Sequence, residues 1–143
     1  MASVMDVAKY ILHKTGRIST MKLQKLVYYS KAWSLVWDGD PLFPEAIEAW
    51  ANGPVCPELF YAHKGVFLID ENDISGDISV FTKDQKATMD AIYRDYGKKT
   101  ASELSDLTHS EAPWIDARKG IFPGEPCRNK ITDGAMFSYY GSL

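Results

Sequence analysis

The chain has 143 residues, 45% hydrophobic and 24% charged, which predicts one globular domain over residues 1–143. No apolar run approaches the ~20 residues of a membrane helix, and no signal-peptide pattern precedes the first helix. Two cysteines are too few for a disulfide framework. We therefore expect a cytoplasmic protein with reduced thiols and no membrane contact. The net charge of −3 and the pI near 5.6 argue against a dedicated nucleic-acid-binding protein, which is commonly basic.

Two helices are expected at the start of the chain. Ser3 and Asp6 form a capping-box pattern, apolar residues then recur at helical spacing, and Gly16 supplies a stop. A second helix is expected from Met21 to Trp37, after the start signal Ser19-Thr20. Because apolar side chains cover most of its circumference, we expect it to be the buried central helix of a bundle.

Basic residues are concentrated in this first part of the chain. Residues 1–37 carry a net charge of +5, whereas the rest of the chain carries −8. Such asymmetry is typical either of a surface for an acidic partner or nucleic acid, or of a solvated helix face with no partner. The second helix interleaves lysines with tyrosines that could stack on bases: Lys22, Lys25, Tyr28, Tyr29 and Lys31.

The middle of the chain is expected to hold short strands between turns. Residues 46–51 have strand composition, and Asn52-Gly53-Pro54 ends that segment sharply. Pro57 favours the first turn of a helix that ends near Gly65. Residues 78–81 are expected to form a second strand that pairs with the first.

Capping signals predict further helices in the second half of the chain. Glu or Gln three residues after the first two caps completes a capping box. The expected N-caps are Thr82, Thr100, Ser110 and Thr132. Residues 120–127 are read as an irregular crossing segment. The fold class is therefore mainly α: a single compact helical domain around a long buried central helix, with at most a small two-stranded β ribbon.

Metal-binding patterns are incomplete. The acidic loop Asp70–Asp77 lacks the terminal glutamate of an EF-hand, because Phe81 stands there. His109-Ser-Glu111 with Cys127 half-matches a zinc deaminase, but Lys130 stands where the second thiolate is needed. We therefore expect no metal site and no cofactor.

Catalytic patterns are equally weak. Cys56 could act as a nucleophile with His63 or His109, but a cysteine between Val55 and Pro57 is more often inert packing. No glycine-rich phosphate loop is present. We expect no catalytic residues and no enzymatic activity.

Three segments carry a more specific signal: Lys22–Trp33, Glu48–Leu59 and Leu107–Trp114. Together they resemble the Panacea domain, the SocA-like antitoxin module of phage-associated proteins. The resemblance runs from Asp6 to Trp114 and weakens toward the C-terminus. Two departures are Cys56, where an aliphatic residue is usual, and residues 115–131, which follow no alignable pattern.

The resemblance implies a non-catalytic antitoxin that neutralises a cognate protein toxin by direct binding, acting also as a chaperone or as an adaptor to a cellular protease. No appended toxin-binding domain is expected, so the Panacea surface itself would bind. The alternative is a prophage-encoded regulator or adaptor that binds a host protein or nucleic acid.

Two places are expected to contact the partner, namely the basic side of the central helix and the corner that follows Trp50. The candidate partner-binding residues are Lys22, Lys25, Tyr29, Trp50, Asn52, Gly53, Pro54, Val55, His109 and Trp114. Tyrosine and tryptophan are favoured anchors at interfaces, but they also dominate core packing. The alternative is therefore that these residues only maintain the fold, with the glycine needed for its backbone and the prolines for stiffness.

Overall fold

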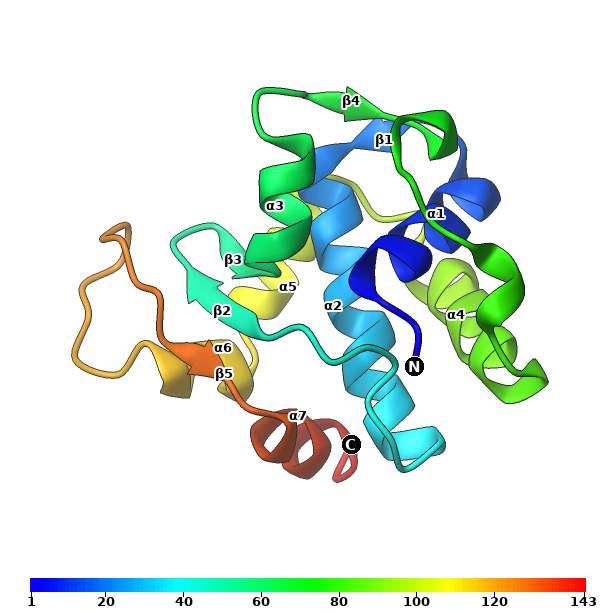
Figure 1. Cartoon of the computed structure of the whole chain (residues 1–143). Helices are drawn as coiled ribbons and strands as arrows, with labels where there is room; N and C mark the ends of the chain where they lie inside the picture. The colour runs from blue at the N-terminus through cyan, green and yellow to red at the C-terminus, as the bar shows by residue number, and fades with distance from the viewer.

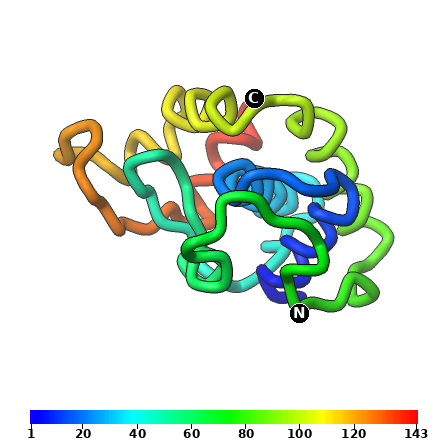
Figure 2. The backbone as a smooth tube through the Cα atoms, turned by 90° about the horizontal axis from the view of Figure 1, so that it is seen from above, coloured from blue at the N-terminus to red at the C-terminus, as the bar shows by residue number.

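One long helix, α2 (Thr20–Trp37), lies at the centre of the computed structural model, which describes all residues 1–143. In Figure 1 it runs through the middle of the molecule, and Figure 2 shows it end-on with other elements around it. The helices that pack on it are α1 (Val4–Thr15), α3 (Pro57–His63), α4 (Lys83–Tyr96), α5 (Ala101–His109) and α7 (Asp133–Tyr140). The short helix α6 (Ala112–Ala117) packs against α5 and α7.

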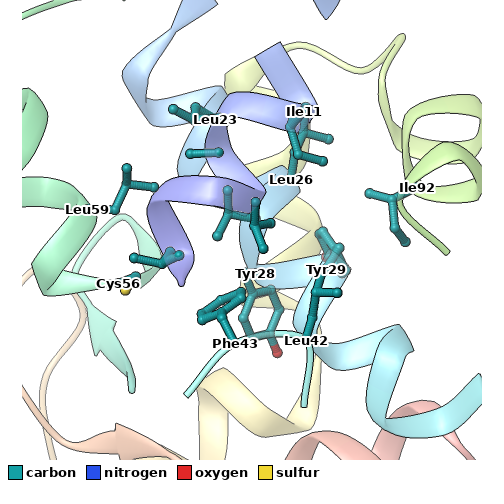
Figure 3. Packing of buried hydrophobic residues seen from close by; sticks show 14 of the residues in the cluster. Ile11, Leu23, Leu26, Tyr28, Tyr29, Leu42, Phe43, Cys56, Leu59 and Ile92 are labelled. Atoms are coloured by element: carbon teal, nitrogen blue, oxygen red, sulfur yellow. The ribbon is translucent and has the colours of Figure 1, made fainter. Parts of the chain in front are cut away.

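The predicted burial of the central helix is confirmed. Leu23 and Leu26 lie among side chains from α1, α3 and α4, represented in Figure 3 by Ile11, Leu59 and Ile92. Twelve of the 18 residues of α2 are buried, including two of its three lysines, Lys25 and Lys31. On the enclosed part of this helix, a polar side chain costs free energy unless it finds a partner. The mainly α fold class is likewise confirmed.

Helix starts follow the predicted caps at most positions. The capping boxes at Ser3, Thr82 and Thr100 are all formed, and Thr132 caps α7. The prediction for Ser110 is wrong: it is the C-cap of α5, and its hydroxyl donates to the Leu107 carbonyl at 2.7 Å. Helix α6 starts one residue later, after Glu111.

The β structure forms two small antiparallel sheets instead of one ribbon. Strand β2 (Ile47–Trp50) pairs with β3 (Gly53–Val55) on one side and β5 (Lys130–Ile131) on the other. Strand β1 (Ile18–Ser19) pairs with β4 (Leu68–Ile69).

The predicted strand at residues 78–81 is wrong. Ile78–Val80 is a turn of 3-10 helix, and another of the same length, Glu71–Asp73, precedes it. The carboxylate of Asp77 accepts hydrogen bonds from the backbone nitrogen of Ser79 at 2.9 Å and from its hydroxyl at 2.6 Å. Such local side-chain bonds compete with strand pairing and favour a turn.

None of the helices has the length and continuous apolar character that a bilayer crossing requires.

Candidate functional site

The β2–β3 hairpin carries half of the ten candidate residues and rests on α5 and α6. We call residues 50–55 the hairpin corner. The Ser105 hydroxyl donates to the Asn52 carbonyl at 2.6 Å, and the Trp114 indole nitrogen donates to the Trp50 carbonyl at 2.9 Å. These bonds fix the corner against segments more than 50 residues away in the sequence.

Gly53 is required where the hairpin crosses α2. Its φ is +124°, a conformation that side chains rarely adopt. A Cβ at this position would lie 2.5 Å from Cε of Lys25 and 3.0 Å from the hydroxyl of Thr108. The backbone of the corner therefore lies directly against the Lys25 side chain, which a larger residue at position 53 would have to displace.

Lys25 is buried without a partner. The residue as a whole is 1% exposed, and its ammonium group has no hydrogen-bond or ion-pair partner within the chain; that nitrogen is not sealed off like the Nε2 atom of His109, because Lys25 lines the neighbouring pocket. Burial lowers the pKa of Lys25 from 10.5 to about 8, with no carboxylate close enough to offset the effect. Lys31 is equally buried, but its ammonium donates to the Glu45 carbonyl at 2.7 Å and lies 3.6 Å from the carboxylate of Asp133. Of these two lysines, only Lys25 keeps an uncompensated charge.

His109 and Trp114 stack on each other beside the corner. Their ring centroids are 4.0 Å apart with an interplanar angle of 17°, and the Arg118 guanidinium lies 5.1 Å from the Trp114 ring. The His109 Nε2 atom is buried and has no hydrogen-bond partner. Burial, together with the nearby charge of Lys25, lowers the pKa of His109, so the imidazole is neutral at physiological pH.

A surface pocket of about 580 Å³ opens next to the corner. It lies between the first turns of α2, the hairpin corner, α3 and the segment around residues 124–128, the orange loop at the left of Figure 1. Its aromatic wall is formed by Trp50, Phe60 and Tyr61. Its positive charge comes from Lys25, Lys64 and Arg128. None of its 16 lining residues is acidic.

Lys22 and Tyr29 lie apart from the corner. The Lys22 ammonium donates to the carbonyl of Gly97 at 2.6 Å, which ties α2 to the end of α4. Tyr29 is fully buried, and its hydroxyl donates to Oε1 of Glu111 at 2.7 Å, where the Tyr140 hydroxyl also donates at 2.8 Å. Burial raises the pKa of Glu111. The sequence placed Glu111 in an incomplete zinc pattern and in the segment Leu107–Trp114, but it did not predict this polar network.

The proposed nucleic-acid face of α2 is not available at the surface. Two of the three lysines and both tyrosines that it needs are buried: Lys25, Lys31, Tyr28 and Tyr29. Stacking on bases and contacts with phosphates both require exposed side chains. The charge asymmetry of the sequence therefore does not correspond to a basic stripe along this helix.

The cysteine and histidine candidates for catalysis are held in packing positions. Burial raises the pKa of the Cys56 thiol to about 12, so it remains protonated. The ring of His63 is hydrogen-bonded to the amide of Gln24 at 3.0 Å. No three His, Cys, Asp or Glu side chains are grouped to hold a metal ion.

Comparisons with known proteins connect this site to one family. The family described as "Antitoxin SocA-like, Panacea domain" matches residues 23–115, which include the hairpin corner, Lys25, His109 and Trp114. Antitoxin SocA from Caulobacter vibrioides (strain NA1000 / CB15N) is 30% identical over 124 residues, which span 76% of this chain and 66% of that protein. The chain thus covers just under two thirds of that relative's length. No solved structure matches.

Proposed function

The chain belongs to the SocA-like antitoxin family with a Panacea domain, and on that premise we propose that it neutralises a cognate toxin by direct protein–protein binding. The family match carries this proposal. The proposed antitoxin is non-catalytic and needs no cofactor, and residues 1–143 act as one domain. A chaperone or protease could act on the complex afterwards.

The hairpin corner is the proposed contact surface. It lies inside the matched residues, it is fixed by bonds to α5 and α6, and Asn52 at its tip is exposed. A fixed backbone loses little conformational freedom on binding, which favours affinity. Lys25 and Tyr29 are buried, so Tyr29 contributes by stabilising the fold, while Lys25 is reached only through the neighbouring pocket.

Co-expression tests the proposal. Each small gene next to the gene of this protein is induced in bacteria, first alone and then together with this chain, and complexes are recovered by pull-down. Growth arrest that the chain relieves, with recovery of a stable complex, is the expected result. Relief without a complex would contradict direct binding and favour an adaptor that delivers the toxin to a protease.

If no neighbouring gene is toxic, the antitoxin proposal is wrong and the regulator or adaptor interpretation takes its place.

A matched pair of variants tests the contact surface. Asn52→Arg places a long charged side chain on the exposed tip of the corner, and Asn72→Arg makes the same change at an exposed site in a 3-10 turn. We expect Asn52→Arg to weaken rescue and complex recovery and Asn72→Arg to leave both unchanged. Equal rescue by the two variants would exclude the corner tip from the interface.

A further inference from the structure

We propose that the pocket beside the hairpin corner binds an acidic peptide segment, with a carboxylate of the segment paired to Lys25 and an adjacent apolar side chain on the aromatic wall. That the segment belongs to a toxin rests on the proposed function. The preference for an acidic peptide follows from the residues of the pocket itself.

The charge of the lining favours an anionic group. Lys25, Lys64 and Arg128 line the pocket, and no aspartate or glutamate does. Glu48 contacts two of the lining residues: its Oε1 accepts from the Trp50 indole at 2.8 Å and lies 3.4 Å from Nε of Arg128. Glu48 is thus occupied at the rim and does not neutralise the pocket floor.

Lys25 supplies the observation that points to a ligand. A buried charge costs free energy unless it is paired, and pairing usually comes from a carboxylate with good hydrogen-bond geometry. Lys25 is 1% exposed and unpaired, yet it lines the pocket, so an incoming carboxylate can reach it. A charge-assisted hydrogen bond formed away from bulk water is stronger than one at an open surface.

The walls favour a peptide over a nucleic acid. Phe60 is half-buried and Tyr61 is 60% exposed on the pocket side of α3. A partly exposed aromatic wall beside a single buried cation fits an acidic side chain next to an apolar one. A polyanionic backbone instead needs many exposed basic groups.

The first test uses two peptide probes on the full chain labelled with ¹⁵N. One is acetyl-Gly-Phe-Asp-Phe-Gly-amide, and the other has Asn in place of Asp. We expect the Asp peptide to shift the backbone amide signals of Asn52, Val55 and Arg128 and to bind roughly 10-fold more tightly, the value of one charge-assisted hydrogen bond. In Lys25→Met the two peptides should bind equally. Equal binding to the wild-type chain, or signal changes confined to another face, would overturn the proposal.

Two variants with the same change of charge control for a long-range effect of net charge on peptide binding. Arg128→Glu changes the rim of the pocket, and Lys86→Glu makes the same charge change on an exposed position of α4. Only Arg128→Glu should weaken binding of the Asp peptide. An equal loss of affinity in both variants would refute a specific site. Because Arg128 is exposed, this comparison holds even if Lys25→Met folds poorly.

The two proposals can fail separately. If the chain rescues growth but the Asp peptide binds no better than the Asn peptide and Lys25→Met rescues fully, the pocket proposal is wrong and the antitoxin proposal stands. If the Asp peptide binds in the pocket but no neighbouring gene is toxic, the antitoxin proposal fails and the pocket remains an acidic-peptide site.

Discussion

Replacement of Lys25 by methionine should stabilise the protein at neutral pH. The side chain is buried, its ammonium group has no partner within the chain, and burial alone lowers the pKa of Lys25 from 10.5 to about 8. A shift of that size corresponds to about 3 kcal/mol of unfavourable burial of the charged form. Because methionine fills a similar volume without a charge, we expect Lys25→Met to raise the free energy of unfolding by about 1–3 kcal/mol near pH 7.

The pH dependence gives a sharper test, because its sign is defined. Between the folded pKa of about 8 and the ordinary value of 10.5, the unfolded chain still holds a proton that the folded chain has released. The unfolded state therefore binds more protons, and the stability of the wild-type chain rises with pH in that window. The rise should be about 2–3 kcal/mol between about pH 7 and about pH 10, and Lys25→Met should lack it.

Urea unfolding, followed by the fluorescence of the four tryptophans, measures both curves. The difference between wild type and Lys25→Met cancels the contributions of other groups, such as Tyr10, whose pKa burial raises to about 12. A stability difference that stays constant with pH, or a methionine variant that is less stable near pH 7, would refute the conclusion that Lys25 carries an uncompensated charge.

Three further substitutions test the contacts around the site by the same unfolding measurement. Gly53→Ala should cost about 2–4 kcal/mol because of its φ of +124° and the contact with Lys25, whereas Gly124→Ala, at +84° in open space, should cost about 1 kcal/mol. Equal costs would show that only the dihedral angle matters. Glu111→Leu should cost about 2–4 kcal/mol because two tyrosine hydroxyls lose their acceptor, whereas Glu111→Gln keeps the acceptor oxygen and should cost less than about 1 kcal/mol. Because burial raises the pKa of Glu111, ionisation of this carboxyl lowers the stability of the wild type as the pH rises above the carboxyl's ordinary pKa. Over that range the free energy of unfolding of Glu111→Gln should rise relative to that of the wild type. His109→Phe should stabilise by about 1 kcal/mol, since it keeps the stack on Trp114 and removes a buried unpaired nitrogen; a destabilised variant would mean that the nitrogen has a partner.

Helix starts were predictable because a capping box acts within one turn. The hydroxyl of Thr82 accepts from the Gln85 backbone nitrogen at 3.1 Å, and the Gln85 side chain accepts in return at 2.9 Å. Nothing distant in the chain is needed for this exchange. The wrong prediction that Ser110 is an N-cap also has a local cause. A serine hydroxyl can bond to the backbone at the end of one helix as well as at the start of the next.

The environment of α2 could not be predicted because its partners are distant in the sequence. From the sequence we expected Lys25 to lie on a basic side of this helix that contacts the partner. The residue that covers it is Gly53, on a hairpin, and the acceptor for Tyr29 is Glu111, 82 residues away. Strand β5, only two residues long, carries no alternation that could have identified it. Periodicity reports the composition of a helix face, but the fold decides what covers that face.

The motif residues can support the fold or contact a partner. The structure favours the first interpretation for some of them and the second for others. Gly53 and Trp114 have structural roles that account for them, since one permits a close crossing and the other bonds to the Trp50 carbonyl. His109 keeps a buried nitrogen that the folded chain leaves unpaired, and Lys25 keeps an ammonium group that finds no partner within the chain and lines the pocket. An unpaired buried group lowers stability, so folding alone does not explain it. The side chains that lack partners inside the protein are therefore the ones to test first for a partner outside it.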